Sequence, residues 1–247
     1  MRRLLTALAL LAAACNGIGE SAERTDSVCD SFEKVQRRIL PDTSRFVVVE
    51  DMIPEIDVEL RYYGCDNFIG VPVDGYQEET AILTREAALA LKNISDSLKK
   101  LNLGIRIYDA YRPKRAVAHF KRWSRVLSDT TNKQHYYPNL DKGSLFGRGY
   151  LSSRSNHTHG STVDLTLVSL TDGMALDMGS DFDLMDERSH YSYRGLTDEQ
   201  RSNRQLLRRM MMWGGYSPIE SEWWHFKLRN EPYSEEFDFP VNRDSIP

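Results

Sequence analysis

The stretch SSRSNHTHGSTVDLTL, residues Ser152–Leu167, joins a polar segment to the start of an apolar strand. It contains His157 and His159 before a glycine, and Asp164 opens the apolar run that follows. A carboxylate at the start of a hydrophobic strand is costly to bury unless a positive group lies against it. His157 and Asp164 are both ligand types for zinc. The stretch alone leaves two interpretations open: half of a metal site, or a polar loop entering a strand.

The composition is typical of a globular protein of one or two domains. Of the 247 residues, 40% are hydrophobic and 28% are charged. A chain of this length can bury a substantial hydrophobic core. The formal net charge is −4 and the sequence contains no basic stripe. Because proteins that bind nucleic acid carry clustered positive charge, we expect no nucleic-acid partner.

The N-terminus has the three parts of a secretory signal. Arg2 and Arg3 supply positive charge, residues 4–11 are apolar, and residues 12–14 are alanines. Cys15 follows directly, which resembles the bacterial lipoprotein signal, in which this cysteine carries the lipid; the alternative is cleavage nearby with Cys15 incidental. We therefore expect a signal over 1–14, a tether over 15–40 and a single domain over 41–247. The expected localisation is the cell envelope, as a membrane-anchored periplasmic lipoprotein.

The cysteine count agrees with export. The chain has three cysteines, an odd number. If Cys15 carries lipid, Cys29 and Cys65 remain and can form one disulfide in an oxidising compartment. The alternative is two free thiols.

The pattern of apolar residues predicts an α+β fold, because helices and short strands follow one another without regular alternation. Thr84 is the expected cap of one helix, which Gly104 ends, and Thr197 with Gln200 forms a capping box for another that ends at Gly214. The expected strands are 46–49, 56–62, 105–108, 163–168 and 222–226. The expected helices are 84–103, 114–127 and 197–213, with a further short helix near 30–40 and a long loop over 128–150.

A catalytic zinc site uses three protein ligands and leaves one position for water. Among the six histidines, His225 is the attractive third ligand because Glu222 precedes it by three residues and is suited to general base catalysis. On an ideal strand, residues three apart point to opposite faces, so the pair needs a twist or a bulge.

The chain contains two patterns, Ser155-x-His157-x-x-Gly160-x-x-x-Asp164 and Glu222-x-Trp224-His225, that resemble the zinc D-alanyl-D-alanine dipeptidases of the vancomycin-resistance type. These belong to the D-Ala metallopeptidase and hedgehog-like superfamily. Further matching patches at 66–68, 108–113, 177–183 and 222–226 extend the resemblance from about Phe46 to Phe226. The resemblance implies a small mixed or antiparallel sheet flanked by helices.

The resemblance also implies one Zn²⁺ per chain and a role for each matching residue. By this resemblance the zinc ligands are His157, Asp164 and His225, the acid/base is Glu222, the oxyanion stabiliser is Arg112, the groups that hold the substrate ammonium are Tyr62 and Asp183, and the residues that shape the dipeptide pocket are Ser155 and Trp223.

Two departures from the family put substrate preference in doubt. His159 stands where the family usually has arginine, and Thr162 stands where it usually has alanine. His159 is either a competing ligand or a hydrogen-bonding neighbour of the site.

The expected function is zinc-dependent hydrolysis of D-alanyl-D-alanine in cell-wall dipeptide turnover. Export makes glycopeptide resistance the less expected role. One alternative is a D,D- or L,D-carboxypeptidase that trims peptidoglycan stem peptides, and another is a zinc-binding envelope protein without catalysis.

Overall fold

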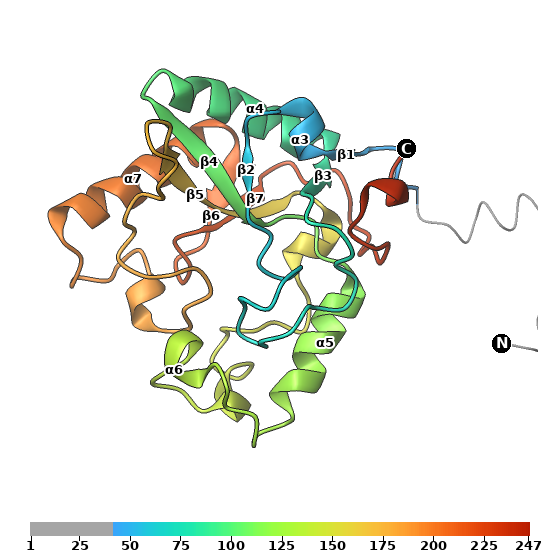
Figure 1. Cartoon of the computed structure of the whole chain (residues 1–247), viewed down its shortest axis with the longest axis vertical. Helices are drawn as coiled ribbons and strands as arrows, with labels where there is room; N and C mark the ends of the chain where they lie inside the picture. Colours follow the sequence, from blue (N-terminus) through green and yellow to red (C-terminus); the bar gives the residue numbers. More distant parts are fainter. Residues whose placement is uncertain (1–41) are drawn as a thin grey trace, which may run out of the picture. The chain divides into compact units, whose positions relative to one another are not determined.

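A mixed five-stranded sheet forms the centre of the computed structural model, which describes residues 42–247 (Figure 1). The strand order is β2-β4-β5-β7-β6, with β2 parallel to β4 and every other neighbouring pair antiparallel. A separate antiparallel pair joins β1 to β3. The strands are β1 (Phe46–Val48), β2 (Asp57–Val58), β3 (Ile82–Thr84), β4 (Leu103–Asp109), β5 (Thr162–Ser169), β6 (Tyr216–Pro218) and β7 (His225–Leu228). The predicted α+β class with a small mixed sheet is confirmed.

Helices flank this sheet. In the view of Figure 1, α4 lies above the strands, α7 lies to their left, and α5 and α6 lie below them. The α-helices are α3 (Val49–Met52), α4 (Arg85–Lys99), α5 (Lys114–Ser124), α6 (Lys133–Tyr136) and α7 (Asp198–Trp213), and the 3-10 helices are η2 (Lys142–Ser144), η3 (Asn156–His159), η4 (Glu187–Ser189) and η5 (Arg243–Ser245). No helix in residues 42–247 is both long and apolar enough to cross a membrane.

The predicted helix starts are confirmed by their caps. The Oγ1 of Thr84 accepts the N–H of Ala87, and the capping box of Thr197 and Gln200 is complete in both directions. The predicted end of the first helix at Gly104 is wrong. The helix ends at Lys99, and Asn102 reverses the chain with φ +59°. Asparagine tolerates this left-handed conformation, so a glycine is not needed there.

Other boundaries differ from the predictions because local patterns do not report pairing partners. The strand expected at 56–62 shortens to Asp57–Val58, and the helix expected to reach residue 127 ends at Ser124. The strand expected at 222–226 begins only at His225. The expected loop over 128–150 contains α6 and η2. Strands β3 and β6 were not predicted.

The core lies on both sides of β5. Seven of its eight residues are buried, and Val163, Leu165 and Leu167 are fully buried. A strand covered on both faces is apolar almost throughout, so Asp164 is exceptional within it. The predicted signal, the tether, the helix near 30–40, Cys15 and Cys29 lie outside the described residues. Cys65 is exposed.

Candidate metal centre

Three neighbouring strands bring three polar side chains into one row. In the sheet, Asp164 of β5 is paired with Asp109 of β4 on one side and with His225 of β7 on the other. A register shift between Ile107 and Asp109 interrupts β4 at this level. Such irregularities redirect side chains and often occur beside active sites. The sheet register therefore determines which residues meet at the candidate site.

His157 reaches this row from η3, just before β5. The Oγ of Ser155 accepts the N–H of His157 at 3.3 Å, and Gly160 ends the turn with φ +85°. A Cβ at Gly160 would lie 2.2 Å from a ring carbon of Phe46, so the turn requires glycine for both its conformation and its packing. The imidazole Nδ1 of His157 lies 2.7 Å from the carbonyl oxygen of Ala110. A proton on Nδ1 donated to this carbonyl leaves the Nε2 lone pair free.

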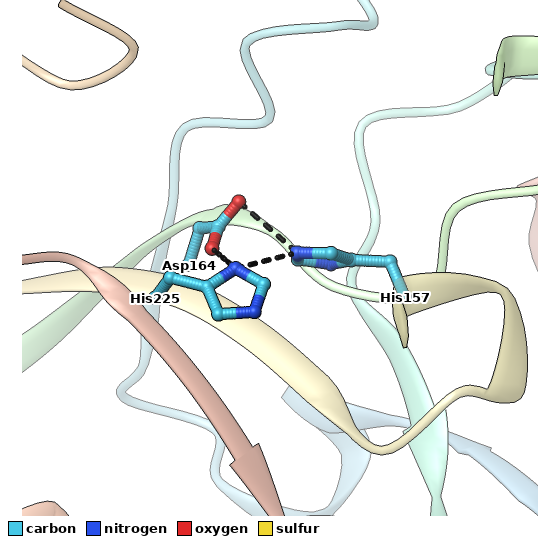
Figure 2. A group of neighbouring side chains, drawn as sticks. All are labelled: His157, Asp164 and His225. Atoms are coloured by element: carbon cyan, nitrogen blue, oxygen red, sulfur yellow. Dashed lines mark hydrogen bonds and ion pairs between the residues drawn. The ribbon is translucent and has the colours of Figure 1, made fainter. Parts of the chain in front are cut away.

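Figure 2 shows the side chains of His157, Asp164 and His225 pointing toward one another. The two imidazole nitrogens, His157 Nε2 and His225 Nδ1, are 3.3 Å apart. The Asp164 oxygens lie 3.2 Å from the first and 3.0 Å from the second. Two ligands of a tetrahedral zinc ion with bonds of about 2.0–2.1 Å are separated by about 3.3 Å. The donor types and their spacing therefore fit one zinc ion.

The electrostatics of the cluster favour an ionised aspartate. Burial by itself would raise the pKa of the Asp164 carboxyl, but the charges of His157 and His225 and their hydrogen bonds hold it well below its usual range. Zinc binds the carboxylate form, so Asp164 is in the state that metal binding requires.

Arg112 lies beside the cluster and is fixed by Asp109. Its Nε and one terminal nitrogen lie 2.8 and 2.7 Å from the Asp109 Oδ2, and the same terminal nitrogen is 3.5 Å from Asp164. Asp109 is fully buried, and its other oxygen accepts the hydroxyl of Tyr76 at 2.7 Å. Asp109 was not among the predicted site residues. Its place three residues before Arg112, at the end of a strand, was the available signal.

Glu222 occupies the turn that leads into β7. Residues Trp223 and Trp224 turn the chain, so that the Glu222 Oε2 lies 3.5 Å from the His225 Nδ1. This turn resolves the conflict that an extended strand would have created, since the two side chains no longer alternate between faces. Burial raises the pKa of Glu222 to about 7, with His225 opposing the shift. A carboxyl group that exchanges its proton near neutrality is suited to acid/base chemistry.

Tyr62 and Asp183 form a second polar pair. The Tyr62 hydroxyl donates to the Asp183 carboxylate at 2.6 Å, and the Arg112 guanidinium lies over the Tyr62 ring at 5.0 Å. Burial raises the pKa of Asp183 to about 8, with the Tyr62 hydrogen bond opposing the shift. Asp183 also has φ +60°, an uncommon conformation for a residue with a side chain. Such strain is common where a side chain must be aimed at a ligand.

The three candidate ligands and most of the groups beside them line one cavity of about 210 Å³, but Asp109 and Tyr76 do not. Its walls include the predicted site residues Tyr62, Arg112, Ser155, His157, Asp164, Asp183, Glu222 and His225. The structure does not bring Trp223 to this cavity. Trp223 lines a different hollow and donates its indole N–H to Ser180, while the neighbouring Trp224 lines the cavity. His159 is not part of the ligand cluster, and its Nδ1 lies 2.8 Å from the Glu235 carbonyl oxygen.

Residues 42–242 match the Peptidase M15 family, described as D-Ala-D-Ala dipeptidase. The chain is 41% identical over 198 residues to a D-alanyl-D-alanine dipeptidase of Enterococcus faecalis, covering 80% of this chain and 98% of the relative. It is 39% identical over 200 residues to one from Streptomyces coelicolor, covering 81% and 99%. It is 34% identical over 189 residues to one from Escherichia coli, covering 76% and 87%. The chain belongs to this family.

A comparison with solved structures found a vancomycin-resistance D,D-pentapeptidase in complex with Zn(II). It is 11% identical to this Peptidase M15 member, has a TM-score of 0.36, and covers 72% of this chain and 83% of its own. The chain is a metallopeptidase, and zinc is the cofactor that its buried His-Asp-His cluster fits.

Proposed function

We propose that this Peptidase M15 member hydrolyses the dipeptide D-alanyl-D-alanine and that His157, Asp164 and His225 bind its zinc ion. The observation that carries the proposal is the buried three-residue cluster with Glu222 beside it in a small cavity. The names of the curated relatives support the choice of substrate. When bound, zinc acts as a Lewis acid that polarises the peptide carbonyl and makes water a stronger nucleophile.

Glu222 serves as the acid/base. It accepts a proton from the water as the water oxygen attacks the carbonyl carbon of the peptide bond. It then donates that proton to the amide nitrogen as the carbon–nitrogen bond breaks, so that two molecules of D-alanine leave. Its position 3.5 Å from His225 and its raised pKa of about 7 support this role.

Arg112 opposes the negative charge that develops on the carbonyl oxygen. Its guanidinium is held by Asp109, and the distance of 3.5 Å to Asp164 supports a position beside the reacting atoms. Because Arg112 is fixed before substrate arrives, little reorganisation is needed when the charge appears, and its effect falls on the transition state.

The Tyr62–Asp183 pair favours a dipeptidase over an enzyme that trims longer stems. An ammonium placed against Asp183 would lower the pKa of its carboxyl group and pair with the carboxylate, whereas an acylated amino end would bring no positive charge to it. The cavity of about 210 Å³ is also smaller than the roughly 300–1,000 Å³ typical of pockets for drug-sized ligands. Both features support a short substrate.

The direct test compares D-alanyl-D-alanine with a stem pentapeptide ending in the same two residues, using zinc-loaded protein. We expect release of D-alanine that a chelator abolishes, and a kcat/KM for the dipeptide at least about 100-fold higher, because a buried unpaired carboxylate is costly. Preferential cleavage of the pentapeptide would favour the carboxypeptidase alternative. No release from either peptide would contradict both enzyme proposals.

A Glu222→Gln variant separates catalysis from metal binding. General acid/base catalysis contributes about 10²–10⁴-fold, so we expect kcat to fall by about 10³-fold while the zinc content stays at one ion per chain. Glu220→Gln is the matched control, because Glu220 is exposed and two residues away. Loss of zinc together with activity in Glu222→Gln would instead assign Glu222 to metal binding.

We further propose that the protein is exported, that Cys15 is lipidated, and that the enzyme acts on dipeptide released by cell-wall turnover. About four fifths of the chain covers nearly all of the Enterococcus faecalis relative, and the family match begins at residue 42, so residues 1–41 lie outside it. Mass spectrometry of the native N-terminus should find a lipid-modified Cys15 as the first residue. Peptide mapping without reduction should find Cys29 joined to Cys65, and an unmodified N-terminus or two free thiols would contradict the respective proposals.

A further inference from the structure

The cavity contains two arginines, and only one of them is committed to a partner within the described chain. Arg112 is held by Asp109 through two short contacts. Arg154 is exposed, lines the same cavity, and binds Ser152 only through its backbone N–H at 3.2 Å. Within residues 42–247 its guanidinium makes no hydrogen bond or ion pair. An unengaged guanidinium in the wall of a binding cavity is available to a ligand.

The ligand group that suits Arg154 is an anion, because a guanidinium is positively charged. Asp164, Asp183 and Glu222 carry carboxyl groups, which do not attract an anion, and no lysine lines the cavity. A dipeptide carries an ammonium at one end and a carboxylate at the other. If the ammonium lies against Asp183, the carboxylate at the far end needs a cation. Arg112 is already paired and faces the reacting carbonyl, so Arg154 is the remaining one.

We propose that Arg154 binds the free C-terminal carboxylate of the substrate and thereby selects peptides in which a single residue follows the cleaved bond. This inference rests on the proposed function. A guanidinium matches a carboxylate with two parallel hydrogen bonds, which makes it suited to recognising a chain end. Asp183 and Arg154 together allow the cavity to bind both the ammonium and the carboxylate of the substrate. An amidated C-terminus lacks the negative charge, and an extended C-terminus carries it too far along the chain to meet Arg154.

The test is a binding measurement on zinc-loaded protein in which Glu222→Gln prevents turnover. Calorimetry compares D-alanyl-D-alanine with its C-terminal amide, which keeps the ammonium and removes the negative charge. We expect the preference for the acid over the amide to fall by about ten-fold when Arg154→Ala is added, the low end for a charged hydrogen bond because Arg154 is exposed. Arg154→Lys should keep most of the preference, since the positive charge remains.

Arg148→Ala is the matched control, because Arg148 is exposed on the preceding segment and does not line the cavity. It should leave the preference unchanged. In the otherwise native enzyme, Arg154→Ala should raise KM about ten-fold with kcat within about two-fold, because a contact to the carboxylate is made equally in the ground and transition states. A merely structural role would weaken acid and amide alike.

The outcomes separate this inference from the proposed function. An unchanged acid-to-amide preference in Arg154→Ala overturns the role of Arg154, even if the dipeptide is hydrolysed normally. Binding that depends on Arg154 without any hydrolysis by the native enzyme overturns the proposed function and leaves the Arg154 contact standing. Failure of the zinc-loaded protein to bind either ligand overturns both.

Discussion

Replacing Asp109 with asparagine should lower both activity and zinc affinity, although none of the proposed zinc ligands is replaced. The substitution keeps the shape of the side chain and removes its charge. Asp109 Oδ2 accepts both contacts from Arg112, at 2.8 and 2.7 Å, and also lies 3.5 Å from the His157 Nδ1. An asparagine can still accept the hydroxyl of Tyr76 with its oxygen, but it then turns its NH₂ group toward Arg112.

The size of the effect follows from what Arg112 loses. Removing one partner of a buried ion pair typically costs about 3–5 kcal/mol. Arg112 retains a contact with Asp164 at 3.5 Å and its side chain is 13% exposed, so we expect about 2–3 kcal/mol of lost stability. A displaced Arg112 should lower kcat by about 100-fold, the usual effect of losing one oxyanion donor. Loss of the outer contact to His157 should weaken zinc binding by about ten-fold.

Three measurements check this prediction: steady-state hydrolysis of D-alanyl-D-alanine, zinc titration against a competing chelator, and urea unfolding. Asp57→Asn is the matched control, because Asp57 pairs with Arg106 at 2.6 Å in the same sheet but is partly exposed. It should cost about 1 kcal/mol or less and leave kcat unchanged. An Asp109→Asn enzyme with native kcat and native zinc affinity would refute the role assigned to Asp109.

Three further predictions concern the surroundings of the site. Gly160→Ala should cost about 2–5 kcal/mol in urea unfolding, because the added Cβ has both an unfavourable φ of +85° and a contact of 2.2 Å with Phe46; Gly173→Ala, with φ +73° and open space, should cost only about 1 kcal/mol. In metal-free protein, the stability of the native chain relative to Asp183→Asn should fall as the pH rises from about 4 to about 8 and then level off. The reason is that the Asp183 carboxyl of the folded chain keeps its proton up to a pKa of about 8, whereas that of the unfolded chain releases it near pH 4. Thermal melts that give parallel stability curves for the two proteins would contradict this prediction. His159→Ala should leave zinc affinity unchanged within about two-fold, since His159 faces the Glu235 carbonyl; a large loss would identify it as a ligand.

The elements that the sequence predicted well are those with signals inside a short window. The capping box of Thr197 and Gln200 depends on contacts between residues three apart, and it is present as expected. Strand β5 is apolar along its length because both of its faces are buried, and it was predicted to within a residue at each end. Strands β3 and β6 are three residues long and exist through their pairing, which no local pattern reports.

The site divides in the same way. The resemblance named the residues that meet in the cavity, but it could not supply the turn at Trp223 and Trp224 that brings Glu222 and His225 to one side. Asp109 was overlooked because its role depends on two partners, Tyr76 and Arg112, that only the folded chain brings to it. The resemblance assigned Trp223 to the pocket, whereas Trp224 lines the described cavity, because the side chains of adjacent residues in a turn point in different directions.

The pairing of Asp164 with His225 has a mechanical consequence. These residues are 61 positions apart, on adjacent strands, so an ion bound to both closes a long loop of chain much as a covalent cross-link would. By the entropy estimate used for disulfides, closing a loop of that length is worth about 4 kcal/mol. A metal ion bound to both residues would therefore stabilise the pairing of β5 with β7, and its removal would lower the stability of that side of the sheet as well as the activity.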